Sequence, residues 1–131
     1  MGQKEKARAI IESEYEFLVQ TNLDMDGMLD AARRAMSASS ATMGRVEEVG
    51  LAYTDGDAFA SKYVLKGLGG VMEIMQIALE GTPAETGGMY AELKIGDFMF
   101  QKGSLGMKPS INGRKVIGKF VEVLRAELAA G

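Results

Sequence analysis

Residues 22–33, NLDMDGMLDAAR, carry acids at the spacing of a calcium-binding loop. With the glycine of this stretch at the sixth place, oxygen-bearing side chains fall at the first, third, fifth and ninth places, namely Asn22, Asp24, Asp26 and Asp30. The twelfth place, where a glutamate should supply two oxygens, is Arg33, which adds positive charge instead. An Asp-rich turn that caps a following helix accounts for the same residues, so we expect no metal here.

A glycine-rich turn at residues 66–70, KGLGG, comes before VMEIMQIALEG, whose apolar spacing predicts a helix over 71–81 closed by Gly81. Backbone amides at such a turn can cradle a phosphate. The turn lacks the full GxGxxG spacing and the Lys-Ser/Thr pair of a P-loop. Glycines that let a helix end pack closely explain it more simply. A small phosphate- or nucleotide-binding module or enzyme using this turn is the alternative function.

Catalytic side chains are scarce in this sequence. The chain has no histidine and no cysteine, which removes the commonest proton-transfer group and the thiolate nucleophile. The candidates left are three serines without an evident base and two pairs of neighbouring acids: Ser37, Ser39, Ser40, Asp55 with Asp57, and Glu47 with Glu48. Neighbouring acids in a turn do not normally converge on one substrate. We therefore expect a protein that is not an enzyme and uses no cofactor.

Positive charge near the C-terminal end is the clearest chemical signal. Residues 98–131 hold six basic and two acidic side chains, whereas residues 1–97 hold nine basic and sixteen acidic ones, for a net charge of −3. Five cations lie in residues 101–120, which contain no acid: Lys102, Lys108, Arg114, Lys115 and Lys119. We predict that these five residues, the basic cluster, bind a partner.

Three partners could neutralise the basic cluster: acids of the same molecule, an acidic face of a second copy or another protein, or nucleic acid. Nucleic acid is the weakest, because the rest of the chain is acidic and no aromatic residues are interleaved for base stacking. Asn112 is expected to cap a helix after Pro109, which places Arg114 and Lys115 in its first turn. That helix end is partly positive and prefers acids, so the placement indicates an anionic partner.

Hydrophobic periodicity predicts the elements that position these residues. Helical spacing indicates four helices, over 3–20, 28–36 with Asp24 or Asp26 as its cap, 71–81 and 116–128. Alternation at Val49, Leu51 and Tyr53, followed by Asp55-Gly56, predicts a hairpin whose partner strand is AFASKYVL; a helix capped by Asp57 is the alternative. A strand is expected over 90–100, and a further one in 101–109.

These elements predict a single α+β domain over 1–131, with about four helices packed on a small antiparallel sheet and a long amphipathic C-terminal helix. With 131 residues, 47% hydrophobic and 25% charged, the composition is that of a soluble globular protein. Ten methionines could fill the core or line an interface.

The functional expectation is a non-catalytic structural or assembly protein. It self-associates as a homo-oligomer or docks a partner through segregated acidic and basic faces. The N-terminus is charged and has no long apolar run, so no signal peptide, transmembrane segment or membrane partner is expected. The absence of cysteine fits a reducing compartment or a virus particle, so a cytoplasmic or virion location is expected, with capsid, neck or tail components as candidates.

Overall fold

The structure, a computed structural model, describes residues 2–42, 44–99 and 111–131. It has the predicted α+β class. In chain order the elements are α1 (Gln3–Tyr15), β1 (Phe17–Thr21), α2 (Met25–Ser39), β2 (Arg45–Asp55), β3 (Ala58–Gly67), the short 3-10 turn η1 (Leu68–Gly70), β4 (Met72–Pro83), β5 (Met89–Phe98) and α3 (Ile111–Ala130). Within the described ranges there are three α-helices, not about four.

The five strands form one antiparallel sheet in the order β1-β5-β4-β3-β2. The predicted hairpin of β2 and β3 is confirmed: Asp55 pairs with Ala58 across a turn in which Gly56 has a φ of 60°. Gly56 is suited to this turn because a left-handed backbone costs glycine little. Strands β1 and β2 lie at the two edges of the sheet.

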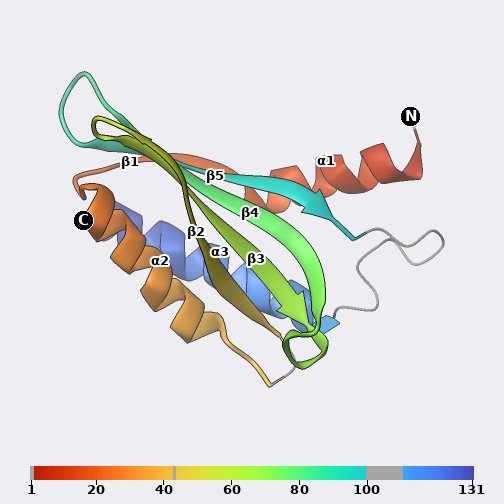
Figure 1. Cartoon of the computed structure of the whole chain (residues 1–131). Helices are drawn as coiled ribbons and strands as arrows, with labels where there is room; N and C mark the ends of the chain where they lie inside the picture. The colour runs from red at the N-terminus through yellow and green to blue at the C-terminus, as the bar shows by residue number, and fades with distance from the viewer. Residues whose placement is uncertain (1, 43, 100–110) are drawn as a thin grey trace.

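Helices α2 and α3 lie side by side over one face of the sheet, and the core fills the space between them and the strands (Figure 1). Alternate residues of β3, Phe59, Tyr63 and Leu65, are buried on this face, and the Tyr63 ring centroid lies 6.1 Å from that of Phe120. The apolar stripe predicted for the last helix is confirmed as the buried side of α3, formed by Val116, Ile117, Phe120, Val121, Leu124 and Leu128. The seven methionines with described burial are all buried or partly buried, and six of them belong to the core or pack against it.

The face of the sheet opposite α2 and α3 is called here the open face. Its β3 residues are the alternate ones, Ala60, Lys62, Val64 and Lys66. Ion pairs cross this face: Lys66 Nζ lies 3.1 Å from Glu47 Oε1, and Lys94 Nζ lies 3.4 Å from Glu80 Oε1. The open face therefore combines ion pairs with the small or apolar residues Ala60, Val64 and Ala78.

Helix α1 covers the part of β5 that lies beyond β1. Strand β1 pairs with β5 only up to Leu93, which leaves the backbone of Ile95 and Gly96 without a neighbouring strand on that side. Side chains from α1 and the residue after it bond to this backbone: Arg8 donates to the carbonyl oxygens of Ile95 and Gly96, and Glu16 Oε2 accepts from the Ile95 N–H at 2.9 Å. The part of β5 beyond β1 is therefore covered by the chain itself, and β1 remains the edge strand on this side.

One predicted helix was wrong and another was too long. Residues 72–81, within the helix predicted over 71–81, belong to β4. Met75, Ile77 and Leu79 of this strand face the helices, while Ala78 is buried on the open face. Apolar residues on both faces hide the strand alternation, so their spacing fits a helix as well as a central strand.

The helix predicted over 3–20 ends at Tyr15, and the next residues form β1, which pairs with β5 far along the chain. The cap predicted at Asn112 is also wrong, because α3 begins one residue earlier, at Ile111. The further strand considered in 101–109 lies outside the described residues.

Candidate functional site

The basic cluster is only partly visible. Lys102 and Lys108 lie outside the described residues, whereas Arg114, Lys115 and Lys119 are exposed on α3. Arg114 Nη2 lies 3.8 Å from Glu14 Oε2 of α1, and Lys119 Nζ lies 3.9 Å from Glu122 Oε1. Exposed ion pairs of this length contribute at most about 1 kcal/mol each. These acids of the same molecule therefore hold the cations only weakly.

Strand β2 exposes the largest group of neighbouring apolar side chains on one strand. Val49 is 67% exposed, Leu51 50% and Tyr53 48%. Single exposed apolar residues are ordinary; here three lie within five residues of one strand, with Leu51 on the helix-covered face, Tyr53 on the open face and Val49 at a bulge. This apolar part of β2 contains no charged side chain, unlike the segment before it.

The backbone of β2 adds a second property to this surface. Strand β2 has a neighbour on one side only, and over the described part of the chain no hydrogen bond from another element reaches its outer edge. An 11-residue edge strand presents a row of free N–H and C=O groups, which is a template for pairing with another strand. The part of β5 beyond β1 is bonded by side chains of α1 and by Glu16, whereas the outer edge of β2 receives no such bond from the described residues.

Two irregularities and three charges restrict what can pair with β2. Val49 and Ala52 have no partner in β3 and form bulges in the strand. Arg45 pairs with Glu47, and Glu48 Oε1 lies 3.1 Å from Arg33 Nε of α2. Hydrogen bonds from Lys66, and then from Arg45, hold the pKa of Glu47 below its ordinary value, so its carboxylate is charged at neutral pH. Bulges and charges are the usual means of limiting which strands can join an edge.

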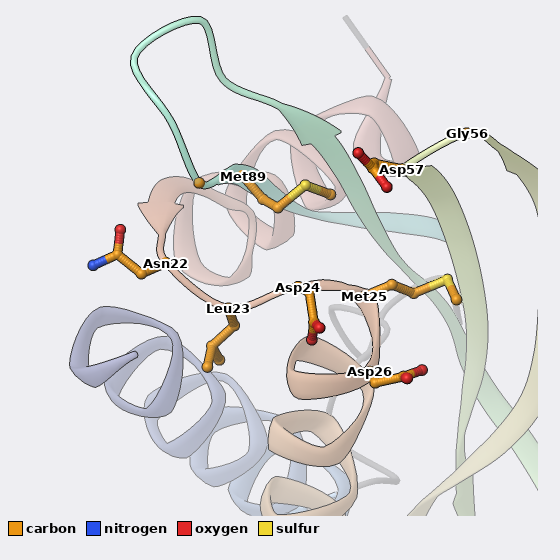
Figure 2. A pocket seen from close by; sticks show the side chains of 9 residues that line it. Asn22, Leu23, Asp24, Met25, Asp26, Gly56, Asp57 and Met89 are labelled. Atoms are coloured by element: carbon orange, nitrogen blue, oxygen red, sulfur yellow. The ribbon is translucent and has the colours of Figure 1, made fainter.

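A hollow of about 390 Å³ lies where the start of α2 meets the β2–β3 turn and the start of β5. Figure 2 shows Asp57 on the turn side of this hollow and Asp24 and Asp26 on the helix side. Asp24 is the predicted cap of α2: its Oδ1 accepts from the Gly27 N–H at 2.8 Å. Among the described residues no group of three or more His, Cys, Asp or Glu is arranged to hold a metal ion. Asp24 therefore has a structural role at the start of α2, and Asp30, further along the helix, lies 3.2 Å from Arg33 Nη1.

The remaining sequence candidates are not brought together into a site. The glycine-rich turn joins β3 to β4, so no helix start follows it to face a phosphate. Ser39 Oγ donates to the Ala35 carbonyl inside α2, and Glu47 and Glu48 engage different partners on opposite faces of the sheet. Asp55 and Asp57 flank the exposed hairpin turn.

The apolar edge was missed by sequence reasoning, although its strand was predicted correctly. Alternation at Val49, Leu51 and Tyr53 suggested one buried face, because buried strands produce the same pattern. A signal was present: charged residues and a glycine within one strand, here Arg45, Glu47 and Gly50, are typical of edges and bulges.

Comparisons with known proteins gave no relatives: no family model, no curated protein and no solved structure matched this chain. In the described part of the chain, no helix has the length and apolar character needed to cross a membrane.

Proposed function

We propose that this protein is a non-catalytic assembly module that self-associates or docks a protein partner. The observation that carries the proposal is the open edge of β2, where unpaired backbone groups and three exposed apolar side chains coincide. Binding by strand addition uses these two features together, since main-chain hydrogen bonds give affinity and the side chains give specificity.

Charge segregation supports the same function. The basic cluster lies towards the C-terminal end and most acids precede it. Charges at the rim of an interface fix its orientation and speed encounter more than they add affinity. We therefore assign the β2 edge the main contact and the basic cluster a steering role towards acidic surfaces. A place in the cytoplasm or in a virus particle, as a capsid, neck or tail part, belongs to this proposal.

Light scattering across a range of protein and salt concentrations tests this function. We expect a mass above the 14.0 kDa of one chain that rises with protein concentration. If the basic cluster steers assembly, association slows as salt is added, because exposed charges are screened. A mass of one chain at every concentration and salt would overturn self-association.

A pair of matched variants locates the contact. Val49→Lys places a charge in the apolar part of β2 and should lower association, since a lysine on an edge strand opposes strand addition. Leu18→Lys is the control, because Leu18 is similarly exposed, at 62%, but lies on β1 at the other side of the sheet. Equal loss of association in both variants would contradict the assignment to β2.

A further inference from the structure

We infer that two copies of this chain pair through β2, antiparallel and centred on Gly50, to join their sheets into one. This inference rests on the proposed function and names its partner, a second copy. In this pairing, the numbers of two residues that stand opposite each other add up to 100. Arg45 then faces Asp55, Val46 faces Thr54, and Glu47 faces Tyr53 of the second copy.

The first argument is that the two faces of the sheet match in this register. Directly opposed residues of an antiparallel pair lie on the same face. Across β2 and β3, five residues of β2 stand opposite open-face residues, namely Arg45 opposite Lys66, Glu47 opposite Val64, Gly50 opposite Lys62, Tyr53 opposite Ala60 and Asp55 opposite Ala58. The two bulges, at Val49 and Ala52, lie on either side of the centre and leave both strand ends on the open face. The proposed pairing therefore joins open face to open face.

Charge and the matching of sheet faces favour this register over the registers centred on Leu51 and on Val49. Moving the centre to Leu51 would oppose Glu47 to Asp55, and like charges directly opposite each other destabilise a strand pair. Moving it to Val49 would oppose Glu47, on the open face, to Leu51, which pairs with Ser61 on the helix-covered face. With the centre at Gly50, each acid of β2 faces a basic or an uncharged residue. Two Arg45–Asp55 contacts form, one at each end.

The side chains at these ends are available for such contacts. Asp55 is exposed and has no ion-pair partner among the residues that the structure describes. Arg45 is exposed as well; it pairs with Glu47 on the same face, and its guanidinium also lies close to Gly70. Arg guanidinium groups can serve two carboxylates at once, because they carry five N–H donors.

Gly50 fits the centre of a two-fold pairing. Its φ of 134° favours glycine, and a Cβ placed there would meet no atom within 4 Å. At the symmetry axis the two Gly50 residues oppose each other, so the absence of side chains permits close approach of the backbones. Val49 and Leu51 flank the axis in both copies, and pairing would bury their exposed apolar surface. The symmetry is isologous, the commonest form in dimers.

A charge-exchange experiment tests the register. Arg45→Glu alone places two carboxylates opposite each other at both ends of the paired strands. Asp55→Arg alone places two guanidinium groups opposite each other at the same ends. Because like charges repel, each variant should raise the dimer Kd by about tenfold or more. Mixing the two variants should form a heterodimer of near wild-type affinity, because both ends then carry opposite charges. The double variant R45E/D55R should self-associate for the same reason. Analytical ultracentrifugation gives Kd, and native mass spectrometry identifies the heterodimer.

The same register defines a control variant and the results that would contradict the pairing. Asp57→Arg makes the same charge change two residues further along, outside the paired segment, and should leave Kd within about threefold of wild type. Circular dichroism verifies that each variant folds. If one of the single variants does not fold, self-association of the double variant R45E/D55R still tests the register. Association that persists unchanged in all the variants would overturn this pairing and leave the proposed function standing. A wild-type chain that stays monomeric would overturn both.

Discussion

At the scale of single residues, glycine positions report how tightly the sheet packs. Gly81 of β4 stands opposite Phe59, and a Cβ there would overlap the Phe59 ring and come within 3.1 Å of Met89 Cε. Gly118, in the interior of α3, has no atom within 4 Å of such a Cβ. The space beside Gly81 is filled by the Phe59 ring, whereas the space beside Gly118 is open.

These two glycines predict opposite responses to the same substitution. Gly81→Ala should lower the free energy of unfolding by about 1–3 kcal/mol, because the added methyl group overpacks the core. Gly118→Ala should raise it by about 0.5–1 kcal/mol, because alanine loses less backbone entropy than glycine in a helix. Urea denaturation measures both. A destabilising Gly118→Ala or a neutral Gly81→Ala would show that the local packing differs from this description.

At the scale of elements, the closing of the β5 edge by α1 depends on a few side chains. Glu16 directly follows α1 and accepts from the Ile95 N–H, and Arg8 donates to the carbonyls beside it. The Arg8 guanidinium also lies 5.2 Å from the centroid of the Phe98 ring. These contacts attach α1 to the side of β5 that has no neighbouring strand there.

Glu16→Ala should therefore destabilise the fold by about 1–3 kcal/mol, because the partly buried Ile95 N–H loses its acceptor. Glu14→Ala is the matched control on the same part of the chain. Its carboxylate is exposed and lies 3.8 Å from Arg114, a long surface ion pair, so its loss should cost no more than about 0.5 kcal/mol. Thermal and urea unfolding measure both variants, and equal costs would contradict the edge-closing role of Glu16.

At the scale of the whole molecule, the sheet is asymmetric. On one side β1 is the edge strand, and α1 with Glu16 covers the part of β5 beyond it; on the other side the edge strand is β2, with three exposed apolar side chains. Natural proteins usually limit such edges, and β2 carries charges and bulges that exclude many pairings. An edge of this kind fits the proposed pairing of two copies through β2.

Hydrogen exchange at two protein concentrations tests this asymmetry. In dilute solution the outward-facing amides of β2 should exchange faster than those of the central strands β3 and β4, since they lack a partner. At high concentration they should gain protection while β1 does not. Protection of β2 that is independent of concentration would mean that its edge is already covered within one chain.

The sequence by itself determined the elements whose signals are local. The apolar stripe of α3, the Asp24 cap of α2 and the Asp55-Gly56 turn each depend on residues within a few positions of one another, so periodicity and side-chain chemistry were sufficient. The charge segregation was also readable, because counting needs no fold.

Only the tertiary structure decided which strands are central and which are edges. Strand β4 resembled a helix in its spacing and became a strand because β3 and β5 supply hydrogen bonds on both sides. Strand β1 exists through pairing with residues about seventy positions away. The same reason applies to the candidate site. The alternation of Val49, Leu51 and Tyr53 predicted a buried face, but these side chains are exposed because no further strand of the described chain lies beside β2. Strand neighbours are set by long-range pairing, which a local pattern cannot encode.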